Sequence, residues 1–251
     1  MGKNKLQKFA DMAAYDHVFE ADFESLQAHG FEYRGRWTEW FGNDNPIVLE
    51  LGCGRGEYTV GLARKNPDVN YIGVDIKGAR MHTGATQAAQ EGLKNVAFLR
   101  TRIEFIEQFF APAEVSQIWV TFPDPQMKKV RKRLVGTLML SRYRNFLKPD
   151  GVVHLKTDSP FLTAYTQAML QVNHIEPQAA SEDLYADIER GVLSDPALGI
   201  RTYYEQKWID AGMTIKYFRF RLPEQAVLAE PDVDIEHDNY HNVGRNVKFD
   251  K

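Results

Sequence analysis

The sequence has a single cysteine, Cys53, among its 251 residues. It therefore allows no internal disulfide bond and no zinc site that needs several cysteines. No run of about 18 apolar residues is present, so we expect no membrane-spanning helix, and the N-terminus lacks the apolar segment of a secretory signal. These absences together predict a soluble, cytoplasmic protein with no membrane partner.

Charge is distributed unevenly along the chain. The net charge is −3, but residues 224–251 contain seven acidic and three basic side chains, which leaves about +1 for the preceding 223 residues. The negative total therefore does not exclude a nucleic-acid partner. In the acidic segment, His237, His241 and the carboxylates are spaced too loosely to predict a metal site.

The length and the 43% apolar content predict one domain with a full hydrophobic core. Apolar side chains recur at helical spacing near the start, so we expect an N-terminal helical segment over residues 1–45. The main domain would cover residues 46–222, and the acidic C-terminal tail residues 223–251.

A glycine-rich turn follows the first predicted strand. Ile47–Leu51 is a short apolar run typical of a buried parallel strand, and a helix is expected from Glu57 to Lys65. Between them, Gly52, Gly54 and Gly56 allow a tight turn that a ligand can approach closely. The order strand, glycine turn and helix is that of a nucleotide-binding unit.

Two acidic side chains indicate which ligand this turn binds. Asp75 ends the second predicted strand, Tyr71–Asp75, where it can accept hydrogen bonds from both hydroxyl groups of a ribose. Glu50, just before the turn, is unfavourable for a pyrophosphate but suits a ligand with an ammonium group. The pattern resembles the first motif of class I S-adenosylmethionine-dependent methyltransferases. A structural turn without a ligand is the alternative.

In such methyltransferases, residues after the third strand often bind adenine. That strand is predicted at Asn95–Leu99, so backbone groups of Arg102 and Ile103 are candidates, with Ile103 packing on the ring. Glu104 could serve instead, or it could be a charge that stabilises a helix N-terminus.

The fourth predicted strand, Val115–Thr121, leads into a loop in which prolines flank Asp124. Ligands of open parallel sheets bind beyond the carboxyl ends of the strands, so this loop should face the reactive methyl group of the cofactor. Each proline restricts the residue before it, and we therefore expect Phe122 and Asp124 to be extended. A structural turn capped by Asp124 is the alternative.

Five basic side chains follow within six residues: Lys128, Lys129, Arg131, Lys132 and Arg133. Such a run can neutralise RNA phosphates, which orient a nucleic acid without reading its bases. The neighbouring carboxylate of Asp124 can accept hydrogen bonds from the Watson–Crick edge of a guanine. A solvated charge run is the alternative.

Together these motifs resemble the bacterial tRNA (guanine-N7-)-methyltransferase family over roughly residues 45–222. Two further motifs add to the resemblance, Thr157-Asp158 after the fifth predicted strand and Thr202-Tyr203-Tyr204-Glu205. The resemblance implies that S-adenosylmethionine methylates guanine 46 in the variable loop of tRNA.

The resemblance also implies roles for single residues. Cofactor contacts fall on Glu50, Gly52, Gly54, Asp75, Arg102, Ile103 and Asp124. Asp124 would be the catalytic residue, and Lys128, Asp158, Thr202 and Glu205 would contact the substrate. From spacing alone, Asp158 could equally cap a helix, and Thr202 with Glu205 fits a capping box.

This sequence departs from the family pattern at three places. Gln126 stands where the family usually has Trp, and the basic run is about two residues shorter and lacks its customary His. Arg102 replaces the usual Asp after the third strand. None of these departures changes Asp124.

We therefore expect an α/β, doubly wound, mostly parallel seven-stranded sheet with an antiparallel last strand. Guanine N7 has a free lone pair and no proton, so methyl transfer would depend on positioning and electrostatics. A methyltransferase acting on an exocyclic amino group is one rival. Such enzymes usually have an aromatic residue two positions after the acid or amide of this loop, whereas this sequence has Gln126-Met127 there. A non-catalytic RNA-binding module is the other. Whether the protein is a monomer or a homodimer stays open.

Overall fold

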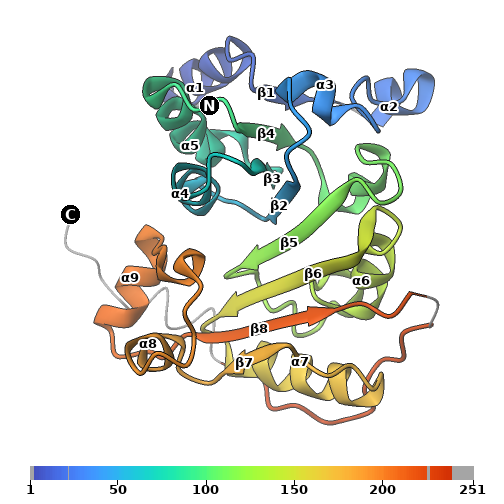
Figure 1. Ribbon diagram of the computed structural model, residues 1–251, viewed down its shortest axis with the longest axis vertical. Coiled ribbons are helices and arrows are strands. Elements are labelled where there is room, and N and C mark those ends of the chain that lie inside the picture. Colours follow the sequence, from blue (N-terminus) through green and yellow to red (C-terminus); the bar gives the residue numbers. More distant parts are fainter. Residues whose placement is uncertain (1–2, 22, 225–226, 239–251) are drawn as a thin grey trace.

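The computed structural model describes residues 3–21, 23–224 and 227–238, except for the side chains of residues 3–6 and 9. Residues 239–251 of the predicted tail, including His241, lie outside the described residues. Within the described residues, one sheet of eight strands has the order β1-β4-β3-β2-β5-β6-β8-β7 (Figure 1). The strands are Val18–Glu20 (β1), Ile47–Leu51 (β2), Asn70–Asp75 (β3), Val96–Arg100 (β4), Val115–Thr121 (β5), Leu147–Thr157 (β6), Ala179–Ser181 (β7) and Lys216–Arg221 (β8).

Strands β1 to β6 are parallel, whereas β8 runs antiparallel to both β6 and β7. The predicted antiparallel last strand is thus confirmed, and so is the α/β doubly wound class. All five residues of β2 are buried, which explains why four of them are apolar, because helices cover both faces of a parallel sheet.

Helices pack on both faces of the sheet. The α-helices are Lys3–Ala13 (α1), Phe23–His29 (α2), Trp37–Phe41 (α3), Glu57–Lys65 (α4), Gly78–Glu91 (α5), Thr137–Tyr143 (α6), Pro160–Val172 (α7), Leu184–Glu189 (α8) and Tyr203–Asp210 (α9). Short 3-10 helices are Ile103–Gln108 (η1), Val130–Lys132 (η2) and Pro196–Gly199 (η3). Among these described helices, none is long and apolar enough to cross a membrane.

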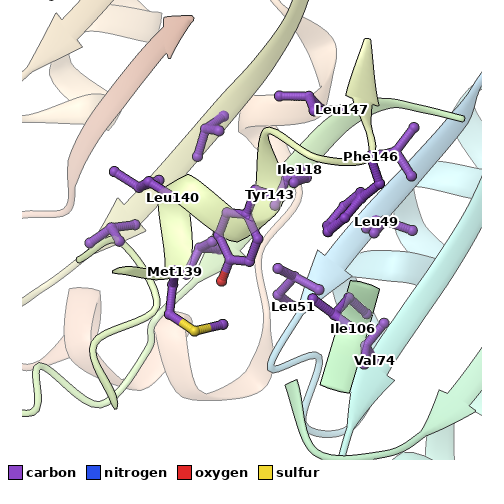
Figure 2. Packing of buried hydrophobic residues seen from close by; sticks show 14 of the residues in the cluster. Leu49, Leu51, Val74, Ile106, Ile118, Met139, Leu140, Tyr143, Phe146 and Leu147 are labelled. Carbon is purple, nitrogen blue, oxygen red and sulfur yellow. The ribbon is translucent and has the colours of Figure 1, made fainter. Parts of the chain in front are cut away.

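The core divides into two apolar clusters, one on each face. Residues of α1, α4, α5 and α8 form one cluster, and residues of α2, α3, α6 and α7 form the other. In the second, Tyr143 of α6 lies beside Ile118 of β5 (Figure 2). Strands β2 and β5 pair in parallel, so their carboxyl ends lie at the same edge.

The number of strands differs from the predicted seven. In the expected N-terminal helical segment, Val18–Glu20 forms a strand, β1, which pairs with β4 at the edge of the sheet. Ala179–Ser181 forms β7 on the opposite edge, where it pairs with β8. Both strands have three residues, too few for an alternating pattern to be recognised in the sequence.

The described part of the acidic tail packs against the main domain. Leu228 is buried, and the carboxylate of Glu230 accepts hydrogen bonds from Thr137 Oγ1 (2.5 Å) and Tyr165 Oη (2.8 Å). Asp238 accepts hydrogen bonds from Ser159 Oγ and from the backbone N–H of Phe161 (3.3 Å) at the start of α7. Acidic side chains of the tail thus make specific contacts with the main domain and are not all solvated.

Candidate active site

The strand order reverses between β2 and β5. From β2 the chain proceeds outward through β3 and β4, and then it returns to β5 and β6 on the other side of β2. Such a switch point opens a crevice beyond the carboxyl ends of the strands. A cavity of about 270 Å³ lies at this point, and its lining includes Glu50, Gly52, Gly54, Asp75, Thr121, Asp124, Thr202 and Tyr204. The structure thus brings together four segments that lie far apart in the sequence.

All three glycines of the turn after β2 adopt left-handed backbone conformations. Their φ angles are +79° at Gly52, +55° at Gly54 and +72° at Gly56, a region that residues with a Cβ rarely adopt. At Gly56, a Cβ would also lie 2.6 Å from the ring of Phe98. The glycines are therefore needed for the fold of the turn itself, whether or not a ligand approaches it.

Glu50 is a buried carboxylate at the floor of the cavity, with 3% of its surface exposed. Its Oε2 accepts hydrogen bonds from the backbone N–H of Thr59 (2.9 Å) and from Thr59 Oγ1. Its Oε1 accepts one from Thr121 Oγ1 (2.6 Å). Burial raises the pKa of Glu50 to about 7, although these hydrogen bonds oppose the shift. A ligand cation would favour the charged form, so the site fits an ammonium group.

Asp75 closes the turn from the neighbouring strand. Its Oδ2 accepts a hydrogen bond from the N–H of Gly54 (3.0 Å), and its Oδ1 accepts one from the N–H of Lys77 (2.7 Å). The carboxylate is thus fixed at the end of β3, where it lines this cavity and also a second, neighbouring one. This place fits the predicted contact with ribose hydroxyl groups.

A second cavity of about 270 Å³ continues from Gly52 and Asp75 to the residues after β4. Arg102, Ile103 and Glu104 line it, together with Lys132 of the basic run. This cavity has the position expected for an adenine ring. Whether Arg102 or Ile103 contacts adenine stays a prediction.

The loop after β5 differs from its predicted conformation. Phe122 has a φ of +49° and Gln126 a φ of +50°, so the expected extended conformation is wrong for Phe122. The N–H of Phe122 donates to the carbonyl of Lys156 (2.8 Å), which is the last hydrogen bond of the parallel β5–β6 ladder. The chain turns directly after it, and Phe122 is left-handed although a proline follows it. Such strained positions are typical of functional loops. Asp124 is exposed, and its Oδ1 accepts a hydrogen bond from the N–H of Gln126 (3.0 Å).

The prediction that Arg133 binds phosphate is wrong for this conformation, because only 2% of its surface is exposed. Its Nε donates to the carbonyl of Pro125 (3.1 Å), and a terminal nitrogen donates to the carbonyl of Gln126 (3.3 Å). Its guanidinium carbon lies 3.8 Å from the centre of the Tyr165 ring. Arg133 therefore ties the loop that carries Asp124 to helix α7.

The other four members of the basic run, Lys128, Lys129, Arg131 and Lys132, are exposed. They flank η2, and η2 follows the Asp124 loop directly. Their phosphate and substrate contacts stay predictions, and their exposure is compatible with them.

The predicted substrate contact of Glu205 is wrong for this conformation, because Glu205 is fully buried and makes an ion pair with Lys156. Asp158 is also buried, with 2% exposure, and its Oδ1 has no hydrogen-bond partner in the described part of the chain. Burial raises the pKa of Asp158 to about 6. Thr202 is partly exposed and lines the cavity, although its hydroxyl accepts a hydrogen bond from the N–H of Glu205 (3.2 Å).

Sequence reasoning missed contributors to the site. Thr59 and Thr121 hold the carboxylate of Glu50. Thr121 could have been found, since it ends the strand before the loop. No sequence motif marks Thr59, because its contact with Glu50 depends on how α4 packs against β2.

Comparison with known proteins agrees with this geometry. A family model described as "Putative methyltransferase" matches residues 44–218. A tRNA (guanine-N(7)-)-methyltransferase of Bacteroides thetaiotaomicron is 59% identical over 98% of this chain and 96% of its own. The chain belongs to the tRNA (guanine-N(7)-)-methyltransferase family. Further members of this family, from Bacteroides fragilis and Porphyromonas gingivalis, are 57% and 54% identical and are matched over 96% and 97% of their lengths.

Solved structures share the fold of this family member at low sequence identity. The 16S rRNA methyltransferase KamB superposes with a TM-score of 0.57 at 14% identity, over 75% of this chain and 94% of its own. A 16S rRNA (adenine(1408)-N(1))-methyltransferase variant from Catenulisporales acidiphilia gives 0.55 at 16% identity, over 76% and 94%. Both likenesses confirm the class I methyltransferase fold.

Proposed function

We propose that this protein transfers a methyl group from S-adenosylmethionine to N7 of a guanine in tRNA. Membership of the tRNA (guanine-N(7)-)-methyltransferase family supports the reaction. The observation that carries the proposal is that Glu50, Asp75 and Asp124 line one cavity at the switch point. As the finer proposal, the target is guanine 46 in the variable loop, and the reaction takes place in the cytoplasm.

The residues around the glycine turn fit S-adenosylmethionine, which supplies an electrophilic methyl group on a sulfonium. Glu50 would hold its ammonium group, since the buried carboxylate lies at the cavity floor, held by Thr59 and Thr121 and without an ion-pair partner among the described residues. Asp75 would hold the ribose hydroxyl groups, and the backbone at Arg102 and Ile103 would line the adenine. Two carboxylates in one site exclude a pyrophosphate by repulsion.

Asp124 would act on the guanine. N7 carries a lone pair, so no residue has to remove a proton before the methyl transfer. The product base is cationic, and a nearby carboxylate stabilises this developing charge. Asp124 is exposed at the cavity mouth, where it could also accept hydrogen bonds from the guanine edge.

The exposed bases Lys128, Lys129, Arg131 and Lys132 would bind the phosphates of tRNA. Each such contact makes affinity fall with salt concentration and contributes little to sequence preference. Their position next to the Asp124 loop would direct the RNA backbone across the mouth of the cavity.

The test is incubation with unmodified tRNA and S-adenosylmethionine, followed by nucleoside mass analysis. We expect 7-methylguanosine, and we expect it to be lost when guanine 46 of the tRNA is replaced by adenine. Formation of 7-methylguanosine elsewhere in the same tRNA would overturn only the assignment of guanine 46 as the target. Formation of N6-methyladenosine would favour the amino-group rival, and no binding of S-adenosylmethionine in calorimetry would favour the RNA-binding module.

A further inference from the structure

Lys156 and Glu205 form an ion pair in the interior of the protein. Their Nζ and Oε1 atoms are 2.7 Å apart, and both side chains have 0% exposure. The two residues come from different parts of the fold, since Lys156 lies near the carboxyl end of β6 and Glu205 in the first turn of α9. A fully buried ion pair is uncommon, because removing two charges from water is costly. Its place beside the active-site cavity therefore needs an explanation.

The ammonium group of Lys156 has a complete set of acceptors. Besides Glu205, Nζ donates to the carbonyl of Ile200 at 3.1 Å and to that of Leu198 at 3.4 Å. Burial lowers the pKa of Lys156, while the neighbouring Glu205 carboxylate opposes this shift. The three acceptors fix the segment that leads from η3 into α9.

The carboxylate of Glu205 is equally occupied. Its Oε1 also accepts a hydrogen bond from Tyr185 Oη at 2.6 Å, and its Oε2 accepts one from the N–H of Thr202 at 3.2 Å. Glu205 thus points into the protein and closes the capping box that starts α9. No part of it faces the cavity.

Lys156 also contacts the other side of the active site. Its carbonyl accepts a hydrogen bond from Phe122 N–H, the last bond of the β5–β6 ladder before the Asp124 loop. Its side chain, through Glu205, holds the segment in which Thr202 and Tyr204 line the same cavity as Asp124. One residue of β6 therefore contacts both walls of the cavity.

We propose that Lys156 is a positioning residue, whose buried ion pair with Glu205 holds the Thr202–Tyr204 segment opposite the Asp124 loop. The proposal rests on the proposed function. It assigns Glu205 an internal role in place of substrate contact. Buried ion pairs are often no more stabilising than apolar pairs of similar volume, so the pair supplies a defined geometry and not stability.

The first experiment is a double-mutant cycle with K156M, E205Q and the double variant, in which the kcat/KM for tRNA and the Kd of S-adenosylmethionine are measured. We expect each single variant to lower kcat/KM about tenfold or more, and the double variant to be no worse than either, because all three break one interaction. The Kd should change less than about twofold. K148M is the matched control, since Lys148 lies in the same strand but is exposed.

Two results would overturn the proposal. If Glu205 contacted tRNA directly, E205Q would be severe, K156M would be mild, and the effects of the two changes would add. If the pair served only stability, the double apolar variant K156M/E205L would fold and keep full activity. This variant leaves no buried charge unpaired, so it also tests the proposal if a single variant does not fold.

The second experiment does not depend on methylation and so separates this proposal from the proposed function. In K156M/E205L, hydrogen exchange of the backbone amides at residues 203–206 should become at least about tenfold faster, while exchange in β2 and β3 stays unchanged. Unchanged exchange at residues 203–206 would contradict the proposal. Absence of 7-methylguanosine from the wild-type reaction would contradict only the proposed function.

Discussion

The two walls of the active-site cavity are built in different ways. The cofactor edge, residues 47–77, is one continuous strand-turn-helix-strand unit, held by hydrogen bonds such as Gly54 N–H to Asp75 and Thr59 to Glu50. The substrate edge consists of two separate segments, residues 121–133 and 198–205. A buried cation ties each segment to a distant element: Arg133 of the first segment packs on Tyr165 of α7, and Lys156 of β6 pairs with Glu205 of the second segment.

The difference decides which changes each edge tolerates. The cofactor edge depends on backbone conformation, because its glycines adopt φ angles that other residues rarely adopt. The substrate edge depends on the side chains of two buried cations, so a single charge or length change there can move a whole loop. We therefore expect stability defects from changes at the cofactor edge and catalytic defects from changes at the substrate edge.

The largest expected effect is at Asp124. Asp124→Asn removes the negative charge that would stabilise the methylated guanine, so we expect the methylation rate at saturating substrates to fall by about 100-fold or more. The melting temperature should not change, since the side chain is exposed. Radiolabelled methyl transfer to tRNA measures the rate. Full activity in a correctly folded Asp124→Asn variant would show that the assigned role is wrong.

A smaller catalytic loss is expected at Arg133. Arg133→Lys keeps the charge but loses the planar group that donates to both Pro125 and Gln126 and packs on Tyr165. Because a small displacement of the Asp124 loop is costly, turnover should fall by about 10- to 100-fold. Arg190→Lys is the control, since Arg190 is exposed at the end of α8, does not line the cavity, and its variant should stay near wild-type turnover. Equal losses of turnover in both variants would contradict the proposed role of Arg133 in fixing the Asp124 loop.

At the cofactor edge, two glycines should differ in stability cost. Gly56→Ala introduces a Cβ 2.6 Å from Phe98 at a φ of +72°, so we expect a loss of about 3 kcal/mol in the free energy of unfolding. Gly54→Ala has a similar backbone strain, but its Cβ would make only an ordinary contact, 4.0 Å from the carbonyl oxygen of Gly52, and it should cost about 1 kcal/mol. Urea unfolding measures both. An equal cost at the two positions would mean that contact with Phe98 does not matter.

The smallest effect is the pH dependence of cofactor binding. Glu50, with a pKa of about 7, is largely protonated at pH 6 in the free protein and must lose this proton to pair with an ammonium group. Affinity for S-adenosylmethionine should therefore rise about fivefold from pH 6 to pH 7. It should level off above pH 7, before the ligand's own amine titrates. Calorimetry measures the affinity, and the same slope in Glu50→Gln would rule out Glu50 as the titrating group.

The two edges also differ in how far the sequence predicted them. The strand, glycine turn and acidic strand end of the cofactor edge have fixed spacing within about 30 residues, so local pattern was sufficient. The loop with Asp124 was predicted in place but not in conformation, because Phe122 is left-handed in spite of the extended conformation that the following proline favours. The strands β1 and β7 were missed because pairing at the sheet edge, and not pattern, defines them.

Charged residues were the least predictable part of the site. Arg133 is adjacent to four exposed bases, and nothing in the sequence distinguishes it from them. Glu205 fits both a capping box and a substrate contact, and only the position of Lys156 decides between them. Burial of a charge depends on what packs around it in three dimensions, so the sequence alone assigned both residues to the surface.

The most direct test of the division between the two edges is the affinity of Arg133→Lys for S-adenosylmethionine, measured by calorimetry beside its turnover. We expect a Kd within about twofold of wild type although turnover falls, because the cofactor edge is held by its own hydrogen bonds. A Kd that weakens in proportion to the loss of turnover would contradict the division and show that the Asp124 loop also shapes the cofactor edge.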